Sequence, residues 1–244
     1  MRIARFHQPE LPRGDAPLPL SADAARHIAR VLRLRVGARI ELFDGDGNAC
    51  LAELTEVGPR AVAVRLLSAL PDEPPASLRV HLLLGLSKGE RMDFAIQKSV
   101  ELGVTAITPV ISERCVVRLD EKRGARRQRH WRRILIAACE QSGRNRLPVL
   151  AETTPLGTAL ATSQASLKLL LDPEAEQALG ALADHPARDI AVLVGPEGGL
   201  SPAEIERART RFGFHGVRLG QRILRTETAP LAFLAAAQTL WGDF

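Results

Sequence analysis

A glycine-rich segment with the sequence GPEGG, residues 195–199, directly follows the apolar run IAVLV at residues 190–194. The apolar run predicts a buried strand, and Ser201, Pro202 and Glu204 have the spacing of a capping box that begins a helix. Glycines directly after a strand let a ligand approach the backbone closely, and ligands of α/β proteins bind at the carboxyl ends of strands. The segment is therefore a candidate ligand-binding turn; the alternative is a tight strand-to-helix connection with no ligand.

A second polar loop, LGQRILRTETA, occupies residues 219–229, one predicted strand later. A strand is predicted to end at Gly220, and an apolar helix is predicted to begin at the end of the loop. Two such loops at the ends of neighbouring strands would converge on one site. Thr228 alone could simply cap the helix. The loop nevertheless carries more charges and hydrogen-bond donors than a simple connection needs, namely Arg225, Thr226, Glu227 and Thr228.

Residues 118–133 form a basic stretch, with eight arginines and lysines against two acids. One interpretation is a solvated loop and helix face. The other is a surface that contacts phosphates, because the guanidinium group of arginine forks onto phosphate oxygens. The chain has no tyrosine and only 4% aromatic residues, so a platform on which the bases of single strands stack is poorly supported. We expect recognition of a folded RNA shape instead.

No metal site is predicted. The segment DGDGN at residues 44–48 resembles the start of a calcium loop, but its sixth position is Ala49 rather than glycine and its twelfth is Thr55 rather than glutamate, so we expect a hairpin turn. The histidines show no paired spacing, and Cys50, Cys115 and Cys139 have no CxxC spacing. Neither the dinucleotide fingerprint nor the P-loop occurs.

The bulk composition favours a soluble protein with a polyanionic partner. The 244 residues are 45% hydrophobic and carry a formal net charge of +5, which favours nucleic acid without requiring it. The first residues have no apolar run typical of a signal peptide, and no run approaches the ~18 apolar residues of a membrane span. An odd number of widely spaced cysteines favours a reducing compartment. We therefore expect a cytoplasmic protein.

Residues 1–72 are predicted to form a small β-barrel domain. Residues 21–32 predict a short helix with Ser21 as its N-cap. Three short β runs follow and are separated by strong turn signals. The proline-rich segment at residues 71–75 then breaks the pattern. The three runs are RIELF (39–43), ACLAEL (49–54) and AVAVRL (61–66).

Residues 73–244 are predicted to form an α/β domain, in which a mostly parallel sheet is covered by helices on both faces. Ser87 and Glu90 predict a capping box that opens a helix closed by Gly103. A second amphipathic helix is predicted around Trp131 and ends at Gly143. The apolar runs that predict the strands are LRVHLLLGL (78–86), TAITPVI (105–111), LKLLL (167–171), IAVLV (190–194) and VRLG (217–220).

The C-terminal helix, residues 229–241, is apolar almost all the way round, with Gln238 and Thr239 as its only polar breaks. A helix on the surface of a monomer normally carries one apolar stripe, so this helix must be buried on more than one side. Because its own sheet covers only one side, we expect a second subunit in a two-fold homodimer to cover the other.

Four stretches together resemble the ribosomal RNA small subunit methyltransferase E family of the SPOUT superfamily. They are HIARVLRLRVG (27–37), GERMDFAIQKSVELGVTAITPVISERC (89–115), AACEQSGRNRLP (137–148), and the pair VGPEGGLS (194–201) and RILRTETA (222–229). The resemblance implies a PUA-like barrel followed by an α/β domain with a C-terminal trefoil knot. It also implies a homodimer that uses S-adenosyl-L-methionine to make 3-methyluridine in 16S rRNA, on the assembled small subunit.

The resemblance further implies which residues form the sites. The cofactor would be bound by Leu171, Gly195, Pro196, Glu197, Gly198, Leu219, Gly220, Ile223, Leu224, Arg225, Thr226, Thr228 and Ala229. Uracil N3 must lose a proton before or during methyl transfer, so a general base or a cation that stabilises the imide anion is needed. Glu227 is the candidate base, and Arg225, Arg144 and Arg146 are the candidate cations. RNA phosphates would be contacted by Arg30, Arg33, Arg35, Arg123, Arg126, Arg127, Arg129 and Arg146.

Two alternatives remain open. The chain could be a knotted methyltransferase that modifies transfer RNA or a ribose 2′-hydroxyl, which the identity of the modified nucleoside would reveal. It could also be a non-catalytic RNA-binding factor of ribosome assembly, which would bind no S-adenosylmethionine. Two polar loops at strand ends favour the enzyme, because an RNA-binding factor has no need of them.

Overall fold

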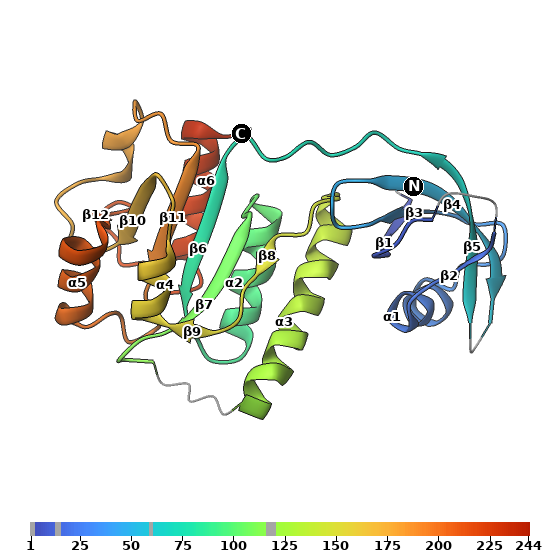
Figure 1. The fold of residues 1–244 in the computed structure, drawn as a ribbon, viewed down its shortest axis with the longest axis horizontal. Coiled ribbons are helices and arrows are strands. Elements are labelled where there is room, and N and C mark those ends of the chain that lie inside the picture. The colour runs from blue at the N-terminus through green and yellow to red at the C-terminus, as the bar shows by residue number, and fades with distance from the viewer. Residues whose placement is uncertain (1–2, 13–15, 59–60, 116–120) are drawn as a thin grey trace. The chain divides into compact units, whose positions relative to one another are not determined.

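The structure is a computed structural model that describes residues 3–12, 16–58, 61–115 and 121–244 (Figure 1). The chain forms two compact units. The barrel unit consists of Met1–Pro75 and Ile136–Leu147, and the sheet unit consists of Ala76–Leu135 and Pro148–Phe244. The sequence predicts one boundary, between residues 72 and 73. The barrel unit also contains the later segment 136–147, which that single boundary assigns to the other domain.

Five strands in the order β1-β3-β4-β5-β2 form the sheet of the barrel unit. The predicted runs are confirmed as β3 (Arg39–Phe43), β4 (Ala49–Val57) and β5 (Val62–Ala69), which pair antiparallel. The sequence patterns did not indicate β1 (Ala4–His7), parallel to β3, or β2 (Leu18–Pro19), antiparallel to β5. Phe6, Ile28, Ile40, Leu42 and Leu54 are buried in the core of this unit.

The segment 44–48 is the hairpin turn that the sequence predicts, and it joins β3 to β4. The Asp44 carboxylate accepts hydrogen bonds from the backbone N–H groups of Asp46 at 2.7 Å and Asn48 at 3.1 Å. Gly45 and Gly47 have φ values of 93° and 111°, a left-handed region that glycine adopts without steric cost.

The predicted helix over residues 21–32 is present, with an unexpected change of winding. α1 (Ala22–Arg26) begins where the Ser21 hydroxyl accepts a hydrogen bond from the Ala24 N–H at 3.2 Å. The next six residues, His27–Leu32 (η1), are wound as a π-helix that ends at Arg33. Arg33 has a φ of 52° and is the only non-glycine residue with a positive φ within the described ranges.

The sheet unit contains seven strands in the order β12-β10-β11-β6-β7-β8, with β9 paired to β7. Every strand pair in it is parallel, which confirms the predicted parallel sheet. The strands are β6 (Arg79–Gly85), β7 (Ala106–Ile111), β8 (Val149–Leu150), β9 (Thr154–Pro155), β10 (Leu167–Leu171), β11 (Asp189–Val194) and β12 (His215–Val217).

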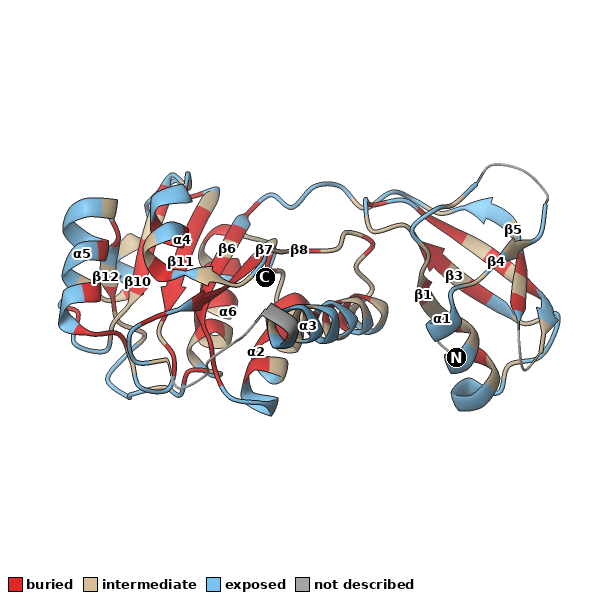
Figure 2. Cartoon of the chain, turned by 60° about the horizontal axis from the view of Figure 1, so that its bottom comes forward, coloured by how far each residue is buried: buried red, intermediate tan, exposed pale blue. Residues whose placement is uncertain are grey.

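Helices cover both faces of this sheet, as Figures 1 and 2 show. α4 (Leu156–Thr162) and α5 (Pro202–Phe212) pack on one face, where Leu160 and Ala208 join side chains of β6, β7, β10 and β11 in one cluster. On the other face α2 (Glu90–Glu101) packs against α6 (Ala229–Trp241). The remaining helices are α3 (Glu121–Ser142) and the short η2 (Leu179–Leu182).

Two predicted boundaries are wrong, namely the start of one helix and the end of one strand. Ser87 does not cap a helix: α2 begins at Glu90 after Gly89, and no side chain caps it. β12 ends at Val217 rather than at Gly220. The backbone of Arg218 instead pairs with the segment before η2, because its N–H donates to the carbonyl of Gln177 and its carbonyl accepts from the N–H of Leu179.

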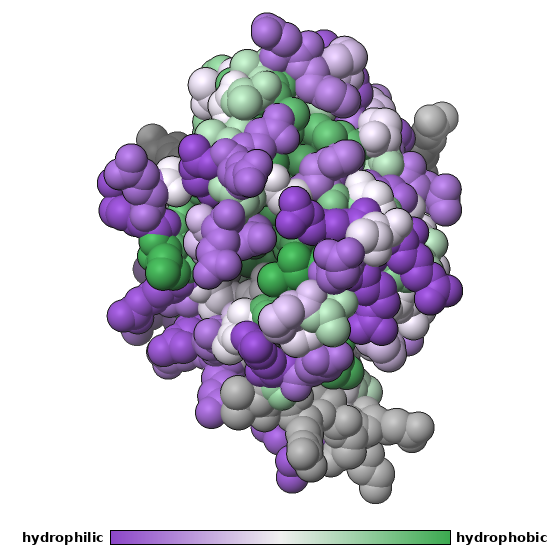
Figure 3. Space-filling model, turned by 90° about the vertical axis from the view of Figure 1, so that its left-hand side faces the viewer, coloured by the Kyte–Doolittle hydropathy of each residue, from purple (hydrophilic) through white to green (hydrophobic). Residues whose placement is uncertain are grey.

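None of the helices in the described ranges has both the length and the apolar character that crossing a membrane requires. On the face of the molecule in Figure 3, hydrophilic side chains separate the apolar surface into patches.

Candidate active site

Three loops meet at the carboxyl ends of the strands of the sheet unit. They follow β6, β11 and β12, and hydroxyl groups connect them. The hydroxyl of Thr226 donates a hydrogen bond of 2.7 Å to the carbonyl oxygen of Gly195, and the Ser87 hydroxyl lies 3.4 Å from that of Thr226. Both side chains are buried. The loop before α6 is therefore fixed to the GPEGG turn and to the end of β6.

The expected convergence of the two polar loops is present, although the expected adjacency of their strands is wrong. β10 lies between β11 and β12 in the sheet. The chain that leaves β12 crosses the end of β10 to bring Thr226 to Gly195. A sequence cannot show this crossing, because strand order along the chain is not strand order in the sheet.

The GPEGG turn approaches the end of β6 closely. The N–H of Gly199 donates to the Pro196 carbonyl at 2.8 Å, and Gly199 has a φ of 68°. A Cβ atom on Gly85 would lie 2.3 Å from the backbone nitrogen of Pro196. Glycine at position 85 is therefore a condition for the turn to take this place.

Glu197 uses its carboxylate to hold the start of α2. Its Oε1 accepts from the backbone N–H of Lys88 at 3.0 Å and lies 3.5 Å from Nη1 of Arg91. Partial burial opposes ionisation, but the hydrogen bonds from backbone N–H groups, together with Arg91, lower the pKa of Glu197 below its usual value. Because the Glu197 carboxylate already contacts Lys88 and Arg91, the turn offers a ligand chiefly its backbone groups.

The predicted capping box at residues 201–204 is confirmed, and it reaches further than predicted. Glu204 is buried; its Oε2 accepts from the Ser201 N–H at 2.8 Å, and its Oε1 accepts from the Glu113 N–H at 2.8 Å. The same carboxylate thus begins α5 and holds the loop that follows β7. A Cβ atom on Gly198 would lie 3.0 Å from the carbonyl oxygen of Arg114 in that loop.

Arg225 and Glu227, the candidate catalytic pair, lie in the loop before α6. Arg225 is exposed. Its backbone carbonyl accepts hydrogen bonds from the N–H groups of Thr228 at 2.8 Å and Ala229 at 2.9 Å. Oε2 of Glu227 is buried without a hydrogen-bond partner among the described residues. A buried carboxylate oxygen with unused lone pairs suits a group that accepts a proton or a donor from a ligand. Thr228 stands at the N-cap of α6, but its side chain makes no capping hydrogen bond.

The other predicted cofactor residues lie around this loop. Leu171 ends β10, opposite Val217 of β12. Leu219 and Gly220 line a groove of about 390 Å³ that α6 and η2 complete. Leu224 is half-buried, whereas the residue Ile223 is 84% exposed.

Arg144 and Arg146 belong to the barrel unit, whereas Arg225 and Glu227 belong to the sheet unit. The backbone N–H of Arg146 donates to the Glu73 carboxylate at 2.9 Å and its Nε donates to the Glu73 carbonyl at 2.8 Å. The carbonyl of Arg144 accepts from Nη2 of Arg5 at 3.3 Å. Arg146 therefore has a structural role within its unit.

The predicted RNA-contacting arginines are mostly exposed, and they occur on both units. Arg30, Arg33 and Arg35 are exposed in the barrel unit, around the end of the π-helix. On α3 in the sheet unit, Arg127 is half-buried and Arg123, Arg126 and Arg129 are exposed. Arg118, part of the same basic stretch, lies outside the described residues.

The sequence patterns did not indicate Gly85 or Ser87. The signal is present, because Gly85 ends the apolar strand β6 and Ser87 follows it, much as the GPEGG turn follows β11, but the spacing of the serine to Glu90 predicts a helix cap instead. Over the ranges that the structure describes, no cluster of three or more histidine, cysteine or acidic side chains could hold a metal ion. Cys139 is buried, and burial raises the pKa of its thiol to about 12, so it is no nucleophile at neutral pH.

Comparison with known proteins agrees with this geometry. The family model of the RNA methyltransferase domain matches residues 74–238, and that of the RNA methyltransferase PUA domain matches residues 20–67. Ribosomal RNA small subunit methyltransferase E of Buchnera aphidicola is 34% identical over 93% of this chain and 92% of its own. The protein of that name from Bacillus subtilis is 32% identical over 92% of each chain.

Two solved structures are similar over their whole length. The crystal structure of ribosomal RNA small subunit methyltransferase E from Neisseria gonorrhoeae, bound to S-adenosyl methionine, is 43% identical with a TM-score of 0.91, covering 100% of both chains. A methyltransferase from Legionella pneumophila, also in complex with S-adenosyl methionine, is 39% identical with a TM-score of 0.95, again over 100% of both chains.

Proposed function

Because this chain belongs to the ribosomal RNA small subunit methyltransferase E family, we propose that it methylates uracil N3 of a uridine in 16S rRNA. The methyl donor is S-adenosyl-L-methionine, and the substrate is the assembled small ribosomal subunit in the cytoplasm. The observation that carries the proposal is the hydrogen bond from Thr226 to Gly195, which joins two loops of the kind a nucleoside cofactor needs.

The cofactor site that we propose is formed by the backbone of residues 195–198, by Leu171, and by the loop 219–229. Glycines in the first turn leave backbone N–H and carbonyl groups accessible to a nucleoside. The residues fit this ligand, because the side chains of Glu197, Thr226 and Ser87 hold the loops in place around the turn. When bound there, S-adenosyl-L-methionine supplies an electrophilic methyl group on a sulfonium ion.

The chain's own residues have three tasks in this reaction. They would hold the uracil next to the methyl donor, they would exclude water, and they would accept the N3 proton or stabilise the charge that remains at N3. Positioning of this kind supplies a large share of the barrier reduction. Glu227 accepts the N3 proton through its unpartnered oxygen, and Arg225 stabilises the imide anion as the proton leaves.

A trefoil knot in the C-terminal part of the sheet unit is part of the proposal. Its support is the chain path: the loop after β12 crosses the end of β10 to Gly195, and α6 then packs against α2. Knots are rare, so tracing the chain in an experimental structure is the test.

A homodimer is also part of the proposal. One side of α6 is buried against its own unit through Phe233, Leu234 and Trp241. Its other side, with Ala232, Ala236 and Leu240, lines the groove of about 390 Å³. A second copy of the chain is the natural cover for an apolar groove of this kind. Light scattering should give a dimer, and an active monomer at micromolar concentration contradicts this.

The experiment that tests the function has two arms. Calorimetry with S-adenosyl-L-methionine should detect a single site on each chain, whereas a non-catalytic RNA-binding factor gives no heat of binding. Small subunits from cells that lack this enzyme should then accept a labelled methyl group from the donor, and wild-type subunits, already modified, should not. Transfer RNA serves as the control substrate, and labelling of transfer RNA alone contradicts the proposal.

A further inference from the structure

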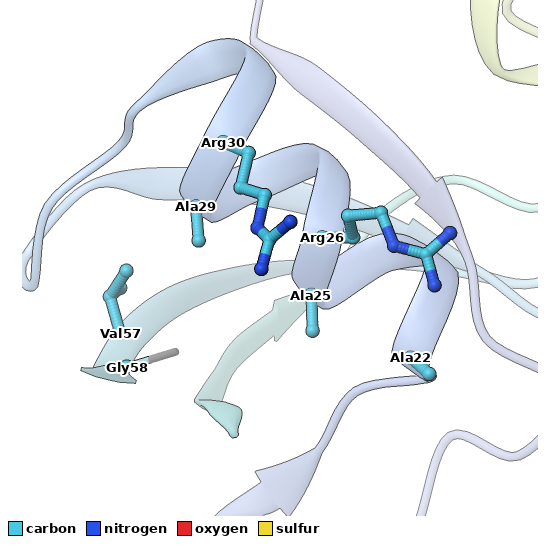
Figure 4. Close-up of a pocket in the computed structure, with 7 residues that line it drawn as sticks. All are labelled: Ala22, Ala25, Arg26, Ala29, Arg30, Val57 and Gly58. Carbon is cyan, nitrogen blue, oxygen red and sulfur yellow. The ribbon is translucent and has the colours of Figure 1, made fainter. Parts of the chain in front are cut away.

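The barrel unit contains a cavity of about 540 Å³ between the α1–η1 helix and the end of β4 (Figure 4). Binding sites for small molecules commonly have volumes of ~300–1,000 Å³, so the space is sufficient for one nucleotide. The described residues that line it belong to the barrel unit: Ala22, Ala25, Arg26, Ala29, Arg30, Val57 and Gly58.

The lining combines small apolar side chains with two guanidinium groups. Figure 4 shows the alanine side chains of the helix on the same side as Val57 of β4, with Arg26 and Arg30 above them. Arg26 makes an exposed ion pair with Asp23 at 3.4 Å, which is weak at such a position. The guanidinium group of Arg30, in contrast to the backbone of this helical residue, has no hydrogen bond or ion pair to a described residue. No carboxylate is among the described residues that line the cavity, so a ligand with an apolar part and a negative charge would suit it.

The backbone next to the cavity is unusual in a way that favours a binding role. The π-helix ends at Arg33 in the left-handed region, which costs a non-glycine residue ~1–2 kcal/mol. π-Helical turns and non-glycine residues in the left-handed region are both frequent at functional sites. The π-helix keeps Ile28 fully buried, while Val31 is 67% exposed and Val36 is 61% exposed among the arginines.

We propose that this cavity binds one unpaired nucleotide of the RNA substrate, with the base on Ala25, Ala29 and Val57 and its phosphate on Arg26 and Arg30. The apolar side chains cover the face of the base, and burial of apolar surface stabilises the contact without an aromatic ring. A base inside a helix is held by stacking and pairing, and it would have to be flipped out at a cost of a few kcal/mol before it could enter. The inference rests on the proposed function, since RNA is the partner, and it adds that the barrel recognises an unpaired nucleotide.

The test compares two RNA hairpins of equal length, one fully paired and one with a single-nucleotide bulge, in equilibrium binding without a methyl donor. The unaltered chain should prefer the bulged hairpin. Ala29→Leu fills the cavity without a change of charge, and it should remove the preference and weaken binding of the bulged hairpin by about 10-fold, which corresponds to ~1.4 kcal/mol. Arg30→Ala should also remove the preference.

The matched control is Arg39→Ala, which removes one charge from an exposed position on the same unit outside the cavity. This variant should bind both hairpins more weakly by the same factor and should still prefer the bulged one. Thermal unfolding establishes that each variant is folded, and Arg26→Ala replaces Ala29→Leu if the larger side chain prevents folding. A preference for the bulge that survives Arg26→Ala and Arg30→Ala overturns the inference. Donor binding and methyl transfer to small subunits are measured separately, so failure of the cavity and failure of the proposed function give different results.

Discussion

The hydroxyl of Thr226 donates a hydrogen bond of 2.7 Å to the carbonyl oxygen of Gly195, which lies 31 residues earlier in the chain. This bond connects the two loops that we propose to bind the cofactor, and it does so across an intervening strand. Backbone carbonyls that are buried need such partners. The proposed cofactor site is therefore held together before any ligand binds.

Replacement of Thr226 tests this connection. Thr226→Val removes the donor, and loss of one hydrogen bond of this kind costs ~0.5–1.5 kcal/mol. We expect calorimetry to show affinity for S-adenosyl-L-methionine reduced by about 2-fold to 13-fold, since 1.4 kcal/mol is a factor of about ten. Thr226→Ser keeps the hydroxyl and should retain most of the affinity. Equal affinities for the valine and serine variants would show that the bond does not organise the site.

A β-branched residue at Gly198 should weaken donor binding more severely. Its Cβ would lie 3.0 Å from the Arg114 carbonyl oxygen, so Gly198→Val must shift the turn as well as block the approach of a ligand. Gly157→Val is the matched control, because a Cβ there meets nothing within 4 Å. Circular dichroism checks that both variants are folded. Donor affinity that is unchanged in a folded Gly198→Val variant removes this turn from the cofactor site.

Arg225 and Glu227 should affect turnover more than donor affinity. Removal of a general base or of an anion-stabilising cation commonly costs ~10²–10⁴-fold in rate. Single-turnover methyl transfer should therefore fall steeply in Arg225→Ala and Glu227→Ala, while calorimetry with the donor changes little. Arg222→Ala removes an exposed charge from the same loop and is the control. Normal single-turnover rates in both variants would exclude these two residues from the chemical step.

The arginines of α3 and of the barrel should set the salt dependence of RNA binding. Each phosphate contact contributes about −0.9 to the slope of log K against log salt. Arg126→Ala or Arg129→Ala should each reduce the slope by roughly one unit, and Arg33→Ala or Arg35→Ala should do the same. The measurement is a salt titration of RNA binding. A variant with all four changes that keeps the original slope contradicts a phosphate-contacting role.

The sequence predicted most of the secondary structure, because period and turn chemistry are local. Five of the seven strands of the parallel sheet, the hairpin at residues 44–48 and the capping box of Ser201 and Glu204 are encoded by neighbouring residues, whereas the two-residue strands β8 and β9 are too short to leave a pattern. What failed depends on distant residues. Ser87 has the spacing of a helix cap, but its hydroxyl lies 3.4 Å from the hydroxyl of Thr226, which is 139 residues away. β12 ends early because Arg218 pairs with the segment before η2.

Part of the candidate site could be predicted in the same way. The GPEGG turn and the loop before α6 are visible as polar residues after apolar strands. Their contact, and the close approach of Gly85 to Pro196, depend on strand order, which the sequence does not display. The role of Arg146 likewise depends on its partner Glu73, on another part of the chain.

The central claim is that this chain places the methyl group on uracil N3, and identification of the product nucleoside tests it most directly. Small subunits from cells that lack the enzyme are incubated with the purified chain and labelled S-adenosyl-L-methionine, and their 16S rRNA is digested to nucleosides. Chromatography with mass spectrometry should place the label in 3-methyluridine alone, at one equivalent or less per subunit. Label in a 2′-O-methylated nucleoside or in 5-methyluridine, or no label in 16S rRNA, contradicts the account.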